Sequence, residues 1–564
     1  MAIHARRDVY DVCIVGSGAG GGMAAYELTK AGANVVLLEA GGAWDNTKDS
    51  DMFVQPWDTP LRGRGTAERP FGEHDACIGG WNVPGEPYTT APGSQFQWWR
   101  ARMVGGRTNH WGRISLRFGP DDFKHKTVDG LGDDWPISYD DMAPYYDDVD
   151  RLIGLFGSHE GLRNHPDGVF LPPPKPRCWE MLVKKAADKQ AVTCIPSRLS
   201  ILTRPLNGRP ACHYCSQCNR GCKVNANFSS TNVLLQPAAR TGKLTMHTDA
   251  MVREVTLGSD GLANGVVYID KATRTERRVD ARIVVLAASA CESARILLNS
   301  RSSKFPAGLA NSSGTVGKYI TDTTGTDVGG FIPALMDQPR HNCDGVGGAH
   351  LYMPWWIGNK TLDFPRGYHI EIWGGMGMPG YGFMGGIQNY EPGGGYGASL
   401  KNDYRRYWGS SIGFSGRGEM IPNEDSYCEL DPRTVDQWGI PVLRFHWKWS
   451  DHEHLQVKHM QETFRALLHE MGAVVQSSMP TREQGYGIST GGSIIHEVGG
   501  VRMGTSSSTS ALNSHCQAWD CRNLFVADGG PFVTQADKNP TWTILALSMR
   551  TSRYIAAQRK EGKL

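Results

Sequence analysis

Short apolar runs separated by a glycine-rich turn open the chain. Residues 12–15 form an uninterrupted apolar run, which is typical of a strand buried on both faces. Residues 19–30 then predict a helix that is stopped by Gly32, and residues 35–38 predict a second buried strand. The order of strand, turn, helix and strand predicts a βαβ unit of an α/β fold.

The same kind of pattern returns in the middle of the chain. Residues 247–256 alternate between apolar and polar side chains, and we expect residues 265–269 to pair with them as a meander. Residues 283–288 predict another buried strand, followed by a helix over residues 292–298. Because this strand and helix repeat the style of the first unit, we expect the first domain to resume here.

The segment of residues 331–449 has a different character. It is rich in Gly, Trp and Tyr, and predicts an antiparallel sheet in a discontinuous α+β substrate domain. Residues 455–470 predict an amphipathic helix. The C-terminal end returns to the first style, with a strand entering a turn at residues 523–529 and a helix over residues 540–557. The predicted fold class is therefore α/β, with a Rossmann-like domain and a second, substrate-side domain.

The turn after the first strand carries a nucleotide-binding pattern. Gly16, Gly18 and Gly21 satisfy G-x-G-x-x-G. In this pattern the first glycine permits a tight turn, the second lets a pyrophosphate approach the backbone, and the third lets the helix pack on the strand. The helix start offers unpaired N–H groups to that anion, and Glu39 can hold a ribose hydroxyl. The unit predicts a dinucleotide site.

Composition narrows the classes of function. The 564 residues carry 59 basic and 57 acidic side chains, so the net charge of +2 gives no electrostatic case for nucleic acid. No apolar run approaches the roughly twenty residues of a membrane-spanning helix. The basic start of the chain leads into the first strand without an apolar signal segment. Thirteen cysteines, an odd number, argue against a disulfide scaffold.

Four of the cysteines lie close together. Cys212, Cys215, Cys218 and Cys222 form C-x2-C-x2-C-x3-C, the spacing of a bacterial iron–sulfur loop, in which the fourth cysteine commonly serves a different cluster. A zinc site more often uses two separated cysteine pairs. The spacing favours an iron–sulfur cluster, with zinc and unmetallated thiols as alternatives.

Several motifs in order resemble one family, the glucose–methanol–choline (GMC) oxidoreductases, flavoenzymes that bind FAD and oxidise alcohols. The resemblance covers essentially the whole chain. It rests on the glycine pattern with Glu39, the Gly105-Gly106 loop, His496-x-x-Gly499-x-x-Arg502-Met503-Gly504, the segment 523–529, and Asn539-Pro540-Thr541.

The resemblance implies a discontinuous FAD-binding domain and a substrate domain threaded through it. The FAD-binding domain is expected to comprise residues 1–50, 95–125, 226–325 and 491–564. The substrate or cap domain is expected to comprise residues 51–94, 126–225 and 326–490, with the iron–sulfur loop at residues 211–223.

The resemblance also assigns catalytic and cofactor-binding roles. Removal of a hydroxyl proton during hydride transfer to FAD needs a base with a pKa near neutrality, which histidine supplies. In the family this base opens the H-x-x-G motif, which here is His496, and its partner at the carbinol oxygen is Asn539. The cofactor is expected to contact Gly16, Gly18, Gly21, Glu39, Gly105, Gly106, Asn109, His110, Val252, Asp528, Gly529, Asn539, Pro540 and Thr541.

His110 lies in the segment Thr108-Asn109-His110-Trp111. This segment resembles that of pyranose oxidases whose histidine is bonded covalently to the flavin. A histidine that only packs near the dimethylbenzene ring is the alternative. Either reading places this loop near the flavin.

The cysteine loop resembles that of bacterial FAD-dependent glucose dehydrogenases, which carry a three-iron cluster. Cys212, Cys218 and Cys222 reproduce the family spacing, whereas Cys215 is an extra thiol that leaves a four-iron cluster open. A cluster carries single electrons from the flavin to an external acceptor, which predicts a dehydrogenase rather than an oxidase. The relatives work with a small subunit that carries the export signal and with a cytochrome c, so we expect a periplasmic or membrane-associated enzyme, with a cytoplasmic one as the alternative.

The substrate is expected to be a sugar or glycoside oxidised at a secondary hydroxyl. The overall look is most similar to glucoside 3-dehydrogenases, which oxidise the third carbon of sugars. Glucose, gluconate or sorbitol dehydrogenases, a pyranose-oxidase-like enzyme, and a flavin electron-transfer subunit without its own substrate are the alternatives. Flat aromatic side chains suit the apolar faces of sugars, although aromatic side chains of a sheet domain are more often part of the core. The aromatic side chains of residues 355–408 that are candidates for sugar binding are Trp355, Trp356, Tyr368, Trp373, Tyr381, Tyr390 and Tyr407.

Overall fold

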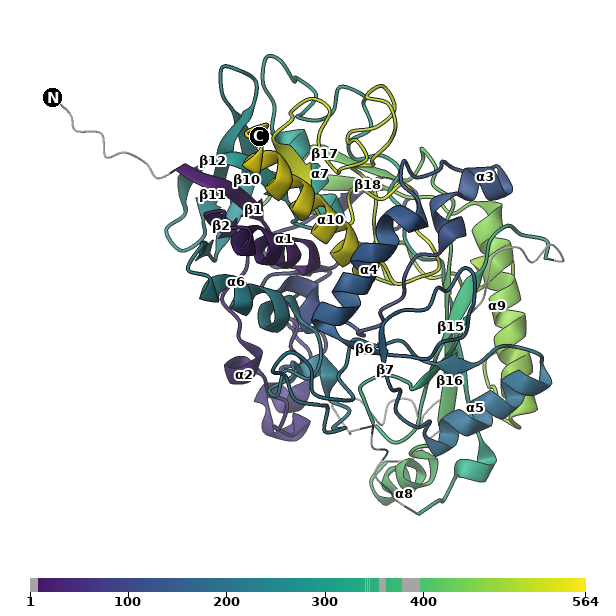
Figure 1. Cartoon of the computed structure of the whole chain (residues 1–564). Coiled ribbons are helices and arrows are strands. Elements are labelled where there is room, and N and C mark those ends of the chain that lie inside the picture. The colour runs from purple at the N-terminus through teal and green to yellow at the C-terminus, as the bar shows by residue number, and fades with distance from the viewer. Residues whose placement is uncertain (1–8, 340, 342, 344, 355–361, 378–395) are drawn as a thin grey trace.

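The fold is built around two sheets (Figure 1). It was obtained as a computed structural model and describes residues 9–339, 345–354, 362–377 and 396–564, together with residues 341 and 343. Among these residues, no helix is both long and apolar enough to cross a bilayer.

The larger sheet has seven strands in the order β10-β11-β12-β1-β2-β9, with β19 also paired to β12. Its centre is parallel, since β12, β1, β2 and β9 pair in parallel, and β10, β11 and β12 form an antiparallel meander. The strands are β1 (Val9–Val15), β2 (Val35–Leu38), β9 (Leu244–His247), β10 (Ala250–Leu257), β11 (Ala263–Asp270), β12 (Thr275–Leu286) and β19 (Leu524–Val526).

The helices α1 (Ala19–Lys30) and α10 (Thr541–Lys560) pack beside each other on this sheet, and α4 (Tyr139–Ile153) packs on α10 (Figure 1). Ser548 Oγ donates a hydrogen bond to the carbonyl of Gly20 at 2.7 Å. A Cβ on Gly20 would lie 1.7 Å from the carbonyl oxygen of Ala527, so this helix face must be glycine. The strand–turn–helix–strand order predicted from the sequence is present.

The second sheet has five antiparallel strands in the order β13-β16-β15-β14-β8. They are β13 (Asp327–Phe331), β16 (Ser411–Gly418), β15 (Tyr368–Gly374), β14 (Leu351–Met353) and β8 (Ile195–Pro196). Figure 1 shows α9 (Asp451–Glu470) along this sheet, and its buried Met460 and Phe464 belong to the same apolar cluster as Ile370 and Phe414 of the strands.

This region is less uniform than the sequence predicts. A helix, α8 (Ala398–Tyr407), interrupts the strands, and α5 (Cys178–Lys189) contacts α9 although the apolar pattern did not single it out. Moreover, β17 (Tyr427–Val435) and β18 (Pro441–His446) form a separate three-stranded sheet with β4 (Thr89–Thr90). Glycine-rich sequence without clear period leaves these choices to tertiary packing.

Short elements complete the chain. They are α2 (Asn46–Asp49), β3 (Gly79–Gly80), β5 (Arg100–Ala101), α3 (His125–Asp129), β6 (Leu155–Phe156), β7 (Phe170–Leu171), α6 (Gln236–Arg240) and α7 (Ala290–Asn299). A π-helical turn at Thr231–Leu235 leads into α6.

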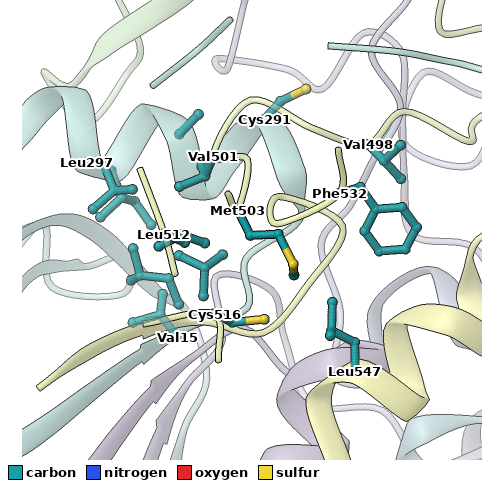
Figure 2. Packing of buried hydrophobic residues seen from close by; sticks show 14 of the residues in the cluster. Val15, Cys291, Leu297, Val498, Val501, Met503, Leu512, Cys516, Phe532 and Leu547 are labelled. Carbon is teal, nitrogen blue, oxygen red and sulfur yellow. The ribbon is translucent and has the colours of Figure 1, made fainter. Parts of the chain in front are cut away.

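The largest apolar cluster joins segments far apart in the chain. Figure 2 shows Val501 and Met503 among Leu297 of α7, Leu547 of α10 and other buried side chains. Met503 is 1% exposed, so this part of the H-x-x-G-x-x-R-M-G run is core. The packing anchors the segment that carries His496.

Candidate functional site

A cavity of about 340 Å³ opens at the carboxyl ends of β1 and β2. Its walls include Val15, Leu38, the starts of α1 and α10, and the loop around residue 106. Crevices at the carboxyl ends of parallel strands are the usual ligand sites of such sheets. Twelve of the predicted site residues line it: Gly16, Gly18, Glu39, Gly106, His110, Val252, His496, Asp528, Gly529, Asn539, Pro540 and Thr541.

The three glycines of the first turn have the geometry that the pattern predicts. Gly16 has φ +97°, which favours glycine. A Cβ on Gly21 would lie 1.9 Å from the carbonyl oxygen of Gly16, so Gly21 lets the helix pack on the turn. A Cβ on Gly18 would meet nothing within 4 Å. Gly18 therefore leaves open backbone at the start of α1, where an anion is stabilised.

The carboxylate of Glu39 is held by this turn. Its Oε2 accepts hydrogen bonds from the backbone N and Oγ of Ser17 at 3.1 and 2.6 Å, and its Oε1 accepts from the backbone N of Gly41 at 2.8 Å. Burial raises the pKa of Glu39 against these bonds. Oε1, which accepts only one of these bonds, retains accepting capacity for a ligand.

The second glycine loop faces the first. A Cβ on Gly106 would lie 3.4 Å from the Cα of Gly18. Gly105, Asn109 and Gly21 are predicted to contact the cofactor, but they lie behind the cavity wall. The side chain of Asn109 is fully buried and donates to the carbonyl of Val104 at 2.8 Å, so it shapes the loop from within.

His496 and Asn539 meet at the cavity. Nε2 of His496 lies 3.3 Å from Nδ2 of Asn539, and Nδ1 of His496 lies 2.9 Å from Oγ1 of Thr323. Since Asn539 donates through Nδ2, the neutral imidazole carries its proton on Nδ1 and offers the Nε2 lone pair. Oδ1 of Asn539 is buried without a hydrogen-bond partner, and so it is left to bind a ligand group.

The surroundings keep His496 neutral. Burial lowers the pKa of His496 to about 3, and the cation of Arg417 acts in the same direction. The backbone N–H of His496 donates a hydrogen bond to Oδ1 of Asp322 at 3.1 Å. Ile495 has φ +66°, a strained conformation for a β-branched residue that costs about 1–3 kcal/mol. The chain thus holds a neutral imidazole at a fixed place, with a pKa below the near-neutral value expected from the sequence, because the side chain is buried.

Glu371 of β15 is a member of this site that the sequence did not single out. Its Oε1 accepts from Nδ2 of Asn539 at 3.2 Å, and its Oε2 pairs with Arg417 at 3.2 Å. Burial by itself raises the pKa of Glu371, but Arg417 and His369 outweigh it and hold the pKa well below its usual range. The ionised carboxylate fixes which way the amide of Asn539 points.

Asp528 closes another part of the cavity wall. Its carboxylate accepts from Oγ of Ser293 at 2.6 Å, from the backbone N of Ser289 at 3.1 Å and from that of Gly530 at 2.7 Å. Burial raises the pKa of Asp528 to about 6. This acid ties the turn after β19 to the start of α7.

His110 also lines the cavity, and the centre of its ring lies 4.5 Å from that of Phe71 in a stacked arrangement. Its Nδ1 lies 2.7 Å from Oδ1 of Asp75. Ile114, four residues after His110, also lines the large cavity. It packs on the same small apolar cluster as Cys212 and Cys218. The cysteine loop therefore sits directly behind this wall.

All four cysteines of the loop line one small cavity of about 10 Å³, and each is a free thiol. Within the described part of the chain, the one group of three potential ligands whose donor atoms all lie within 4.8 Å of one another is Asp122, His125 and Glu419. No three of the cysteine sulfurs are that close. Four thiolates on one zinc ion lie about 3.8 Å apart, given Zn–S bonds of about 2.3 Å. The spacing is wider than a single zinc ion needs.

A row of buried charges lies behind Asn539. Lys538, which is fully buried, has Nζ 2.6 Å from Oδ1 of Asp537 and 2.9 Å from Oδ2 of Asp122. Burial raises the pKa of Glu419 to about 8 and lowers that of His125 to about 3. The ammonium of Lys538 occupies the cation position beside Asp122.

The described aromatic side chains that the sequence predicts to face a sugar divide between core and surface. Tyr368 and Tyr407 are buried, whereas Trp373 is exposed. Four others, namely Trp355, Trp356, Tyr381 and Tyr390, lie outside the described residues. The sugar-facing role predicted for this set gains no support from Tyr368 and Tyr407.

Sequence comparison gives the relatives of this chain. The profiles of a family described as GMC oxidoreductase match residues 19–322 and residues 422–548. The 2-methyl-1,2-propanediol dehydrogenase of Mycolicibacterium austroafricanum is 29% identical over 97% of this chain and 95% of its own length. The fructose dehydrogenase large subunit of Gluconobacter japonicus is 24% identical over 98% of each chain.

A solved structure shares the fold. The formate oxidase of Aspergillus oryzae RIB40, examined for its FAD modification, superimposes with a TM-score of 0.66 at 14% identity, over 99% of this chain and 100% of that chain.

Proposed function

This chain belongs to the GMC oxidoreductases, and on that premise we propose that it is an FAD-dependent dehydrogenase oxidising a secondary hydroxyl of a sugar or glycoside. The observation that carries the proposal is the His496–Asn539 pair. It lines the same cavity as the glycine turn of β1 and α1, so one cavity has a dinucleotide cradle and an alcohol base.

The residues of the cavity fit FAD. Gly18 offers open backbone where a side chain would project, and α1 begins there, which suits a pyrophosphate. Glu39 suits a ribose hydroxyl, and the start of α10 at Pro540 and Thr541 suits the carbonyl end of a flavin. The division into an FAD-binding domain and a cap domain at the boundaries predicted from the sequence is part of this proposal.

FAD, when bound, supplies the acceptor for the hydride of the carbinol carbon. The protein supplies the rest. Nε2 of His496 takes the hydroxyl proton once the substrate hydroxyl replaces Nδ2 of Asn539 at its lone pair, because the imidazole is neutral. Oδ1 of Asn539 has no partner of its own and can accept a hydrogen bond from the substrate, while Glu371 holds the amide by its Nδ2.

The cysteine loop is proposed to hold an iron–sulfur cluster, a three-iron cluster on Cys212, Cys218 and Cys222 or a four-iron cluster that includes Cys215. The four thiols converge on one small cavity yet are too widely spaced for one zinc ion. A carrier of single electrons behind the cavity wall favours a dehydrogenase with an external cytochrome c over an oxidase. A small partner subunit carrying the export signal, and a periplasmic or membrane-associated site of action, complete this proposal.

The substrate is proposed to be a pyranoside oxidised at its third carbon. The support for this substrate is the resemblance to glucoside 3-dehydrogenases. A relative named fructose dehydrogenase large subunit supports a sugar as the substrate class. Glucose, gluconate or sorbitol oxidation is the runner-up. An oxidase is the second candidate, because a relative from Streptomyces fradiae that is 27% identical over 97% of this chain is named paromamine 6'-oxidase. A flavin electron-transfer subunit without a substrate has no need of the His496–Asn539 pair.

The test is turnover by the purified, FAD-containing protein on a panel of glycosides and free sugars. We expect reduction of a one-electron dye, little peroxide, and a 3-keto product identified by NMR. Peroxide formed in step with product would assign an oxidase instead. If the His496→Ala variant reduces the dye as fast as the wild type, His496 is not the base.

A further inference from the structure

One buried carboxylate, Asp75, contacts both the cavity and the cysteine loop. Its Oδ1 lies 2.7 Å from Nδ1 of His110, which lines the cavity, and its Oδ2 accepts from Nδ2 of Asn219 at 3.0 Å. Asn219 stands directly after Cys218 in the loop. Asp75 is 1% exposed, so its carboxylate is shielded from water, whereas Asn219 lies at the surface.

The backbone strengthens this connection. The N–H of Ala76 donates to the carbonyl of Asn219 at 3.0 Å, and the N–H of Cys77 donates to Oδ1 of Asp75 at 2.8 Å. A movement of Asn219 is therefore passed to Asp75 by a side-chain and a backbone bond together. On the cavity side, His110 is held by the same carboxylate that these bonds hold.

A second residue secures the turn that carries His110. Arg113, which is 1% exposed, donates through Nη2 to the carbonyl of Asn109 at 2.8 Å and through Nη1 to that of His110 at 3.2 Å. Since the turn is fixed at its backbone, the orientation of the His110 ring depends on its stacking against Phe71 and on what its Nδ1 binds. That partner is Asp75.

A carboxylate on Nδ1 sets the tautomer and orientation of an imidazole, as acids behind metal-bound histidines do. With Asp75 as acceptor, His110 carries a proton on Nδ1 and turns Nε2 away from Asp75. Any shift of the carboxylate changes both properties.

We propose that Asp75 is a positioning residue that couples the state of the cysteine loop to His110, and through it to the cofactor in the cavity. The proposal rests on the proposed function, in which FAD fills the cavity and the loop holds an iron–sulfur cluster. Binding or loss of the cluster shifts Asn219, Asp75 follows, and the flavin surroundings change.

The test is a double-mutant cycle read from the visible absorption and circular dichroism of the bound flavin. Asn219→Ala lies outside the cavity lining, yet we expect it to change the flavin spectrum, as Asp75→Asn does. The double variant should change it no more than Asp75→Asn alone, because both act through one contact. Gln190→Ala is the matched control, since this exposed amide directly after α5 lies outside the cysteine loop, and it should leave the spectrum unchanged.

A wild-type flavin spectrum in Asn219→Ala overturns the proposal, and so does full additivity in the double variant. If Asp75→Asn does not fold, Asn219→Asp replaces it, because a second carboxylate repels Asp75. An unchanged spectrum in that variant also overturns the proposal.

Iron content measured on the same samples separates this inference from the proposed function. If the wild-type protein contains no iron and Asn219→Ala still changes the flavin spectrum, the cluster proposal is wrong and the coupling proposal stands. Iron-loaded wild type and variant with identical flavin spectra would retain the cluster and remove the coupling.

Discussion

Nε2 of His496 lies 3.3 Å from Nδ2 of Asn539. The histidine comes from a loop before the last strand of the large sheet, and the asparagine from the start of α10. Their convergence on one cavity gives the chain a base and a hydrogen-bonding group side by side. Thr323 and Glu371 hold the two side chains from behind.

Replacement of His496 by alanine should remove catalysis and leave FAD in place. General-base catalysis by a positioned side chain contributes about 10²–10⁴-fold to rate, so kcat should fall by that factor while the flavin content per chain is retained. Steady-state kinetics and flavin absorbance measure both. His452→Ala, an exposed histidine of α9, is the control. A His496→Ala variant within about threefold of wild type would contradict a base role, since general bases contribute far more.

Replacement of Arg417 by leucine should move the acid limb of the pH profile. Burial lowers the pKa of His496 to about 3, and Arg417 adds to this. Without the cation the pKa of His496 rises, so the imidazole becomes protonated at higher pH and kcat/KM falls off earlier as pH decreases. The pH dependence of kcat/KM measures this shift. Arg482→Leu, which removes an exposed charge, should not move the limb; a shift toward lower pH in Arg417→Leu would refute the assignment.

Two glycine substitutions should have different consequences. A Cβ on Gly18 meets nothing within 4 Å, whereas one on Gly21 lies 1.9 Å from a backbone oxygen. Gly18→Ala should keep the unfolding midpoint and weaken FAD binding by about tenfold or more, a change of roughly 1.4 kcal/mol. Gly21→Ala should lower the unfolding midpoint. Flavin titration and chemical unfolding separate the two effects, and equal flavin affinity in Gly18→Ala would show that the cofactor does not approach this turn.

Lys538→Met should destabilise the protein strongly. The substitution leaves Asp537 and Asp122 buried without their ammonium partner, and removing one member of a buried ion pair costs about 3–5 kcal/mol. Urea unfolding of wild type and variant measures the difference. Lys48→Met, which removes an exposed ammonium, is the control and should have little effect. An unchanged unfolding midpoint in Lys538→Met would mean that Asp537 and Asp122 take up protons, so that no unpaired charge is left buried.

The sequence predicts the nucleotide unit well because its signals are local. The apolar runs at residues 12–15 and 35–38, with Gly16 and Gly21 between them, match β1, the turn, α1 and β2. Periodicity and steric demands of glycine act within a few residues of the chain, so a single sequence contains them. The same holds for α9 and α10.

Other site members have no local signal. Glu371 sits in an ordinary strand, and Asp75 lies in a segment without periodicity. Glu371 matters because it contacts Asn539, and Asp75 matters because it contacts His110 and Asn219. Apart from His110, these partners lie more than a hundred residues away in the sequence. Such contacts are fixed by tertiary packing, and a lone acid in a loop or strand gives no indication of them.

Electron paramagnetic resonance is the first measurement to make, because it detects the cluster through which we propose that electrons leave the cavity. We predict that purified protein shows a signal near the free-electron value when oxidised, and that substrate removes it, with loss of signal and iron in Cys218→Ser. A sample that is silent when oxidised and gains a signal on reduction would instead indicate a four-iron cluster that includes Cys215. Silence in both states, with no iron bound, would contradict the account and with it the preference for a dehydrogenase over an oxidase.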